Sequence, residues 1–160
     1  KSASQTATDS AGNTWVVWQA AAVGARDVYL SKLQYGSSFF DAAVPLATGT
    51  SDQANPDIAI GTDDRLYVVW QDNRGGNWDV YMRTSTDGAT WSEERPVTSY
   101  DENEVNPAIV VDSQSPNRAY VAWQGDQDGS YDVFVTSAVS VSGPGVVVWL
   151  EPDRHPHGSK

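Results

Sequence analysis

One phrase occurs three times in this chain at nearly constant spacing, and this recurrence constrains the fold more than any other feature. The three occurrences are WQAAAVGARDVY at 18–29, WQDNRGGNWDVY at 70–81 and WQGDQDGSYDVF at 123–134. Their interval is about 52 residues, and a fixed interval of this size indicates tandem structural repeats.

A second phrase keeps the same spacing. It reads NPDIAI at 55–60 and NPAIVV at 106–111, and residues 3–8 occupy the corresponding place in the first copy. The repeats therefore divide residues 1–152 into three copies, at about 1–53, 54–104 and 105–152. Residues 153–160 are predicted to be a flexible C-terminal tail.

The middle copy contains four strand signals in succession. Apolar or alternating segments at 57–61, 65–71, 79–85 and 90–98 are separated by turns rich in Gly, Asn and Asp, and no segment shows a helical period. Each copy is therefore predicted to form a four-stranded antiparallel meander, and the fold class to be all-β.

The run YVVW at 67–70 has no polar alternation, which predicts a strand buried on both faces. Stacking similar sheets around an axis would bury it, as in the blades of a β-propeller. A solenoid or a sandwich fits the repeat length less well.

Propellers close with at least four blades, so three blades predict a partial propeller. The chain is then either a fragment of a longer propeller or a subunit that an oligomer completes. The simplest such oligomer is a two-fold dimer joined through the first and third copies.

Residues that recur in every copy are expected to be scaffold, because each repeat must solve the same packing problem. The Trp residues are expected to fill gaps between blades, and the Asp residues to bind backbone amides. These residues are Trp18, Trp70, Trp123, Asp27, Asp79 and Asp132.

Composition narrows the possible partners. The chain has no Cys, which excludes a disulfide framework and a thiolate metal site. Its formal net charge of −11 disfavours a nucleic-acid partner and an anionic membrane surface. No apolar run reaches the ~20 residues of a membrane span, so membrane insertion is not expected.

The segment STDGATW at 85–91 resembles the Asp-box, or bacterial neuraminidase repeat, of the sialidase-like β-propeller family. The matching residues are Ser85, Asp87, Gly88, Thr90 and Trp91. The resemblance implies that these residues are a folding element of a turn, on the face away from the active site. It also implies an exported protein, located outside the cell or at its surface.

Catalytic members of that family hold the substrate carboxylate with three Arg and use a Tyr with a carboxylate partner, plus an Asp acid. Here only Arg26 and Arg74 lie in loops of the expected site face. Sialidase chemistry is therefore not supported, and no other catalytic motif is present, so no catalytic residue is assigned. A pair of carboxylates could still hydrolyse a glycoside, which keeps part of a sialidase-like glycoside hydrolase as the alternative.

The loops after each copy's second strand are expected to share one face with the linkers between copies, and loops on rigid scaffolds often carry function. An aromatic ring beside Arg and carboxylates can bind a sugar; alternatively, the aromatic residues cover loop backbone. The ligand-binding candidates on this face are Arg26, Asp52, Arg74, Trp78, Glu102 and Tyr131.

The segment DQDGSYD at 126–132 alternates carboxylates around a Gly, as calcium loops do. Its candidate ligands are Asp126, Asp128 and Asp132, although a hairpin turn rich in Asp explains the segment without metal. No other cofactor is expected. His155 and His157 are interpreted as part of the tail.

The sequence thus predicts a non-catalytic extracellular propeller module that serves as a binding or scaffold element, with carbohydrate as a candidate ligand. Its expected partners are further propeller blades, in the same or another chain, and a glycan.

Overall fold

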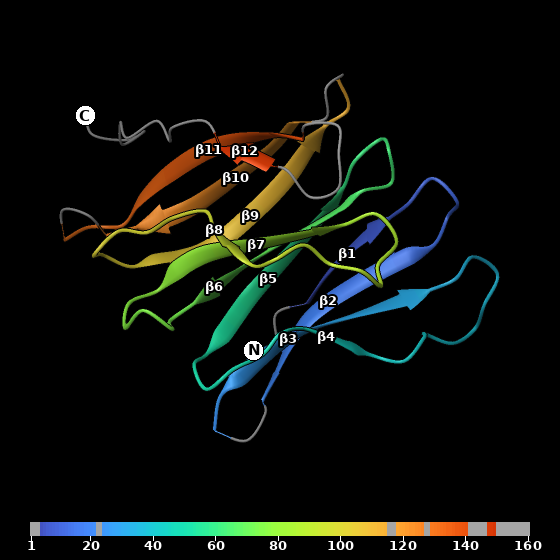
Figure 1. Ribbon diagram of the computed structural model, residues 1–160, viewed down its shortest axis with the longest axis horizontal. Coiled ribbons are helices and arrows are strands. Elements are labelled where there is room, and N and C mark those ends of the chain that lie inside the picture. The colour runs from blue at the N-terminus through green and yellow to red at the C-terminus, as the bar shows by residue number, and fades with distance from the viewer. Residues whose placement is uncertain (1–3, 22–23, 115–117, 127–128, 141–146, 150–160) are drawn as a thin grey trace.

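A computed structural model describes residues 4–21, 24–114, 118–126, 129–140 and 147–149, and side chains up to residue 138. The described residues form three four-stranded antiparallel sheets (Figure 1). No helix occurs among them, so none is present that could cross a membrane. The prediction of an all-β chain with three meanders is confirmed.

Each sheet contains four consecutive strands in chain order. The first sheet comprises β1 (Ser4–Thr8), β2 (Thr14–Ala21), β3 (Arg26–Leu33) and β4 (Val44–Ala47). The second comprises β5 (Gln53–Ile60), β6 (Leu66–Asp72), β7 (Asp79–Ser85) and β8 (Arg95–Pro96). The third comprises β9 (Glu104–Asp112), β10 (Arg118–Gly125), β11 (Asp132–Ser140) and β12 (Val147–Trp149).

The repeated phrase forms the central hairpin of each sheet. Its Trp pairs across the hairpin with the aromatic residue that ends the phrase, and the two rings stack with centroids 5.9–6.2 Å apart. The stacked pairs are Trp18 with Tyr29, Trp70 with Tyr81, and Trp123 with Phe134. The recurrence in the sequence is therefore a recurrence of one cross-strand packing unit.

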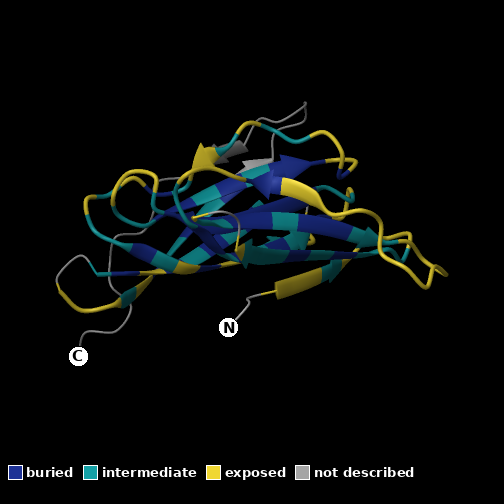
Figure 2. Ribbon diagram, turned by 90° about the horizontal axis from the view of Figure 1, so that it is seen from below, coloured by how far each residue is buried: buried dark blue, intermediate teal, exposed yellow. Residues whose placement is uncertain are grey.

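The second sheet lies between the other two, and its strand β6 is buried along its whole length. Alternate β6 residues face opposite neighbours: Val68 and Trp70 pack against the first sheet, whereas Tyr67 and Val69 pack against the third. Figure 2 shows the buried residues in the middle of the strands and many exposed ones at the turns. Burial on both faces explains why this strand lacks polar alternation.

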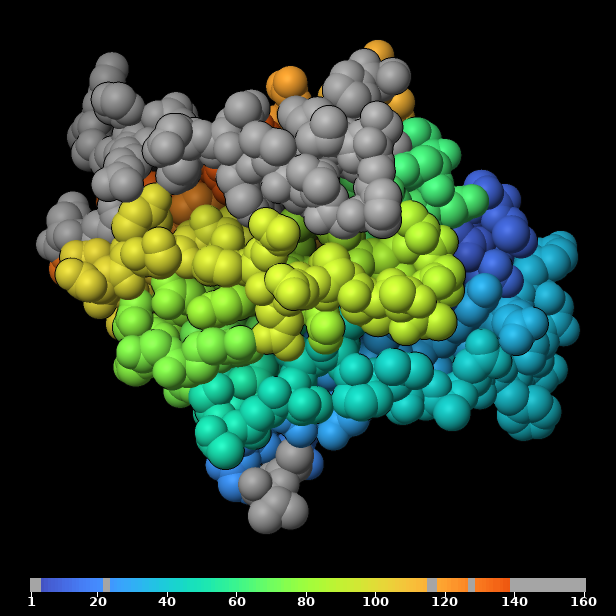
Figure 3. Space-filling model, in the orientation of Figure 1, coloured from blue at the N-terminus to red at the C-terminus, as the bar shows by residue number. Residues whose placement is uncertain are grey.

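The inner strands of successive sheets pack against each other, β1 against β5 and β5 against β9. In the part of the chain that is described, no contact of similar extent joins β1 to β9. Figure 3 shows the three copies following one another across one face of the molecule. The three blades therefore form an open arc, which is a partial propeller.

A hydrogen-bonded link recurs at both boundaries between blades. Gln19 Oε1 accepts the backbone N–H of Asn55 at 2.7 Å, and Gln71 Oε1 accepts that of Asn106 at 2.9 Å. Both Asn residues lie at bulges in the left-handed region, with φ of 49° and 54°, which Asn tolerates better than most residues. We call this contact the Gln–Asn link.

Candidate functional site

The loops and linkers predicted to share a face do meet at one end of the sheets. The β4–β5 linker contacts the β6–β7 loop, where Asn73 N–H donates to the Asp52 carbonyl at 3.2 Å. The β8–β9 linker contacts the β10–β11 loop in the same way, where Asp126 N–H donates to the Asn103 carbonyl at 3.3 Å. We call this end of the molecule the loop face.

Three of the ligand-binding candidates form one cluster across the first boundary. Asp52 accepts hydrogen bonds from Arg26 through its backbone N–H at 2.8 Å and its Nε and Nη2 atoms at 3.2 and 3.1 Å. The Arg26 guanidinium lies 5.7 Å from the ring centroid of Trp78. The Arg26 and Asp52 side chains are 40% and 33% exposed. We call these three residues the Arg26 cluster.

Hydrogen bonds fix the charges of this cluster. The side-chain and backbone hydrogen bonds from Arg26 lower the pKa of Asp52, and the hydrogen bond to Asp52 raises the pKa of Arg26. Arg26 and Asp52 therefore both stay ionised near neutral pH. The cluster presents an ion pair beside a partly exposed indole ring.

Arg74 belongs to a different group on the same face. It forms ion pairs with the fully buried Asp72 and, at 2.7 Å, with Glu94, and its guanidinium lies 4.4 Å from the ring centroid of Tyr81. Burial raises the pKa of Asp72, but the hydrogen bonds from Arg74 outweigh it, and the net pKa is lowered. Neither carboxylate partner of Arg74 was predicted from the sequence. The one sequence signal for such a partner is the charge of Asp72, at a position where the other copies have Ala20 and Gly125.

Glu102 and Tyr131 lie apart from the Arg26 cluster. The backbone carbonyl of Glu102 accepts a hydrogen bond from Asn77 Nδ2 at 2.7 Å, and Tyr131 is 58% exposed beside β11. Among the described residues, no hydrogen bond, ion pair or ring contact joins either side chain to the cluster. The structure thus brings three of the six candidates together.

The calcium candidates are only partly described. Asp126 accepts hydrogen bonds from the backbone N–H and the Nδ2 of Asn103, at 2.8 and 3.3 Å, as Asn73 accepts from the Asp52 N–H at 2.8 Å. Asp128 lies outside the described residues, as do the tail and its two His. Within the described part of the chain, no group of three acidic residues or His, with Asp132 or without it, is arranged to hold a metal.

A carboxyl pair lies beneath the loop face at the second boundary. Glu104 is fully buried, and among the described residues no N–H or hydroxyl group donates to its side-chain oxygens. Its carboxyl lies beside that of Asp79, and the two can hydrogen-bond when one of them is protonated. Burial, followed by the charges of Asp79, Glu102 and Asp126, raises the pKa of Glu104 to about 8. Burial also raises the pKa of Asp79. A protonated carboxyl could act as a general acid, but this one has no exposed atom with which to reach a substrate.

Glu104 was not predicted as a notable residue, although the repeat carries a signal for it. The residue before each Ala/Val-Asn-Pro is Gln53 in the second copy and Glu104 in the third. Both are buried, so the third copy places an acid where the second has an amide. A charge at a repeat position that is otherwise neutral could have identified this residue.

The inner strands border a polar hollow of about 220 Å³. It is lined by Gln5, Asn55, Pro56, Asn106 and Pro107. Two of these lining residues are hydrogen-bonded to each other, because Asn55 Nδ2 donates to Asn106 Oδ1 at 2.9 Å. The hollow is therefore built from the same Asn residues that make the Gln–Asn links.

The Asp87 turn lies between β7 and β8, at the end opposite the loop face. Asp87 Oδ1 accepts the N–H groups of Thr90 and Ala89 at 2.7 and 2.8 Å, and these bonds lower the pKa of Asp87 to about 2. Gly88, with φ of 73°, packs so closely on Trp15 of the first blade that an added Cβ would lie 2.1 Å from the indole. The turn therefore ties the second blade to the first.

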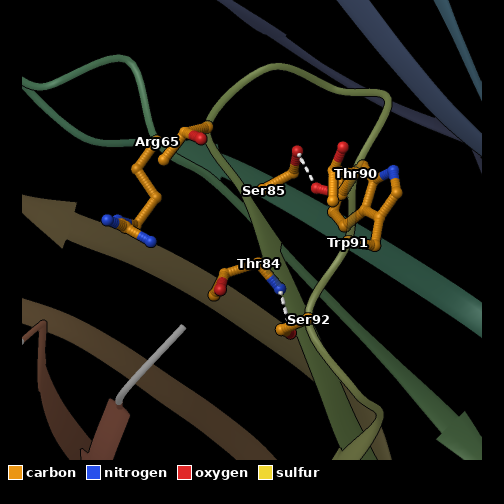
Figure 4. Close-up of a pocket in the computed structure, with 7 residues that line it drawn as sticks. Arg65, Thr84, Ser85, Thr90, Trp91 and Ser92 are labelled. Atoms are coloured by element: carbon orange, nitrogen blue, oxygen red, sulfur yellow. Dashed lines mark hydrogen bonds between the residues drawn. The ribbon is translucent and has the colours of Figure 1, made fainter. Parts of the chain in front are cut away.

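A hollow of about 260 Å³ lies beside this turn (Figure 4). Two of its hydroxyl groups are already engaged within the turn and its flanking strand, because Ser85 Oγ donates to the Thr90 carbonyl at 2.7 Å and Ser92 Oγ accepts the Thr84 N–H at 3.0 Å. Trp91 lines the same hollow and donates its indole N–H to the Gly88 carbonyl at 3.2 Å. We assign no ligand to this hollow.

Comparison with known proteins finds similar structures but no similar sequences. No family model matches the sequence. No curated protein sequence matches it significantly. Among solved structures, it is similar to an α-L-arabinanase of Penicillium chrysogenum in complex with arabinobiose, with TM-score 0.61 and 13% identity over 92% of this chain and 50% of that one.

Two further structures are similar. A GH93 α-L-arabinofuranosidase of Fusarium graminearum with arabinobiose gives TM-score 0.61 and 14% identity, over 92% of this chain and 50% of that one. A mutant of NanB sialidase from Streptococcus pneumoniae gives TM-score 0.56 and 13% identity, over 90% of this chain and 22% of that one. The chain has the propeller fold of these glycosidases and spans half the length of the first two.

Proposed function

We propose that the chain is a non-catalytic segment of an extracellular β-propeller that binds carbohydrate at the Arg26 cluster. One observation carries the proposal: Arg26, Asp52 and Trp78, from three separate segments, come together in a partly exposed ion pair beside an aromatic ring. An indole ring can stack on the apolar face of a sugar, and the ion pair can hydrogen-bond its hydroxyl groups. The structural likeness to glycosidases supports a glycan as the ligand.

The absence of catalytic activity is part of the proposal. Retaining glycosidases need two carboxyl groups ~5 Å apart that reach the substrate. The close carboxyl pair that we describe, Asp79 with Glu104, is buried, and Glu104 has no exposed surface. The partly exposed carboxylate of the cluster, Asp52, is already engaged by Arg26.

Titration calorimetry with arabinobiose and with a sialylated trisaccharide tests the binding proposal. We expect the chain to bind one of them, and Trp78→Ala to weaken binding by about tenfold or more, as removal of a central aromatic contact does. The matched control is Phe39→Ala, because Phe39 is 82% exposed in the β3–β4 turn, at the opposite end of the first blade. Failure to bind either sugar, or an equal loss in both variants, would contradict the proposal.

The second candidate is that the chain is part of a glycoside hydrolase, which the glycosidase neighbours favour. Incubation with arabinobiose and an aryl sialoside, followed by analysis of released sugar, distinguishes the two candidates. Turnover that is lost on substitution of a loop-face carboxylate would favour the hydrolase over the binding module.

A further inference from the structure

The third sheet has one face against the second sheet and one open face. Two valines of this open face, Val110 and Val133, are 61% and 51% exposed. Tyr120, Ala122 and Val135 lie beside them on the same face and are partly exposed. An apolar surface of this kind marks an interface.

The open face repeats a surface that is buried elsewhere in the molecule. Counted from the repeated Trp, the second-sheet equivalents of Tyr120, Ala122 and Val133 are Tyr67, Val69 and Val80. All three equivalents are at most 1% exposed, because the third sheet covers them. The open face thus has the composition of a surface that receives a following blade.

The third sheet also carries the Gln side of a Gln–Asn link. At each internal boundary, the Gln after the repeated Trp accepts the backbone N–H of an Asn in the following blade. Gln124 is the third such Gln; it is exposed and accepts Asn106 Nδ2 at 2.8 Å, as Gln71 accepts Asn55 Nδ2 at 2.9 Å. Gln71 also accepts a backbone N–H from the next blade. No described residue donates a backbone N–H to Gln124 in the same way.

The incoming strand has a recognisable sequence at both internal boundaries. It reads Asn-Pro-x-Ile, as Asn55–Ile58 and Asn106–Ile109, and each Ile is only 5% exposed. The first copy has Ala-Ser-Gln-Thr at 3–6 instead, and Thr6 is exposed on β1. A second copy of this chain would therefore present neither the Asn bulge nor the Ile to the open face.

We propose that the open face of the third sheet is the docking surface for a further propeller blade whose inner strand carries Asn-Pro-x-Ile. Gln124 Oε1 accepts the backbone N–H of that Asn, and the Ile packs on the open face beside Val110. One contact of the boundary between the second and third blades would be absent from the new one. There, Asp57 accepts the Ile109 N–H at 2.8 Å, but the third-blade equivalent of Asp57 is Ala108, which has no acceptor in its side chain. Recognition therefore depends on the Gln–Asn link and on apolar packing.

The chain contains no Cys, so a single thiol can report whether the open face is covered. The experiment compares Val133→Cys in the 160-residue chain with the same substitution in a fusion that carries a second copy of residues 53–104 after Lys160. We expect maleimide labelling at position 133 to be at least about tenfold slower in the fusion, because labelling requires an exposed thiol. Phe39→Cys, in the distant β3–β4 turn, is the control and is expected to react equally in both chains.

A second fusion tests the recognition chemistry. Its appended copy carries Asn55→Ala and Ile58→Thr, which match the first copy of the repeat, and we expect fast labelling at position 133 to return. Equal labelling in the two fusions, or no protection in the first, would overturn the proposal. Labelling of the unfused chain that slows as protein concentration rises, with a dimer in sedimentation, would assign the face to a second copy and overturn it as well.

Discussion

Each of the three repeated Trp residues is followed by Gln, but their surroundings differ. Trp70 and Trp123 are 0% and 1% exposed between sheets, whereas Trp18 is only half-buried, because no described sheet lies on its side of the first blade. Their indole N–H groups also differ: Trp70 donates to Asp72 at 3.4 Å, but the Trp123 indole, followed by Gln124 and Gly125, meets no acceptor in the described part of the chain. The role of a repeated residue thus depends on which neighbouring sheet is present.

This difference predicts unequal effects of truncation. Trp70→Ala should lower the free energy of unfolding by about 3–5 kcal/mol, as large truncations in a core do. Trp18→Ala should lower it by clearly less, since that side chain is already partly in water. Urea denaturation of the two variants measures both values, and equal losses would show that the first sheet is covered as the others are.

The Asp87 turn gives a second prediction for a single residue. Gly88→Ala should destabilise the chain by more than the roughly 1–2 kcal/mol expected for a left-handed residue alone, because the added Cβ would meet Trp15. Gly36→Ala is the matched control: Gly36 has φ of 77° but open space around it. Equal melting temperatures for the two variants would mean that the turn does not pack on the first blade.

At the scale of elements, the two boundaries between sheets have the same architecture but different polarity. Position 53 is Gln, which donates to Ser51 Oγ at 3.0 Å, whereas its equivalent, Glu104, is surrounded by the acidic Asp79, Glu102 and Asp126. An acid without a cationic partner favours its neutral form in such a place. The second boundary should therefore be the one that responds to pH.

The direction of this pH dependence of stability follows from the pKa of Glu104, which is raised from 4.5 to about 8. Its contribution to stability is fully present below about pH 4.5 and is lost as pH rises through 8. Glu104→Gln, which copies the residue at the first boundary, should therefore raise the urea midpoint at pH 8 more than at pH 5. Glu93→Gln, at an exposed position in the β7–β8 loop, is the control. A midpoint difference that is the same at both pH values would contradict the buried acid.

At the scale of the whole molecule, the sequence predicts the architecture better than the site. The spacing of Trp18, Trp70 and Trp123 was sufficient to predict three meanders, because each hairpin is set by local turns and period-two patterning. The partners of the candidate residues were not predictable in this way. Asp52 and Arg26 are 26 residues apart and meet only because the linker between blades returns to the loop face, and the burial of Glu104 depends on how two sheets stack.

The stacking of the blades is tested most directly by amide hydrogen exchange at Asn55 and Asn106, measured by NMR. Both amides should be protected, because each donates to a Gln of the preceding blade. Gln19→Ala should accelerate exchange at Asn55 alone, and Gln71→Ala should accelerate it at Asn106 while the Asn55 amide stays protected. Exchange at unprotected rates in the unsubstituted chain, or equal acceleration of both amides by either substitution, would contradict the arrangement of the three blades.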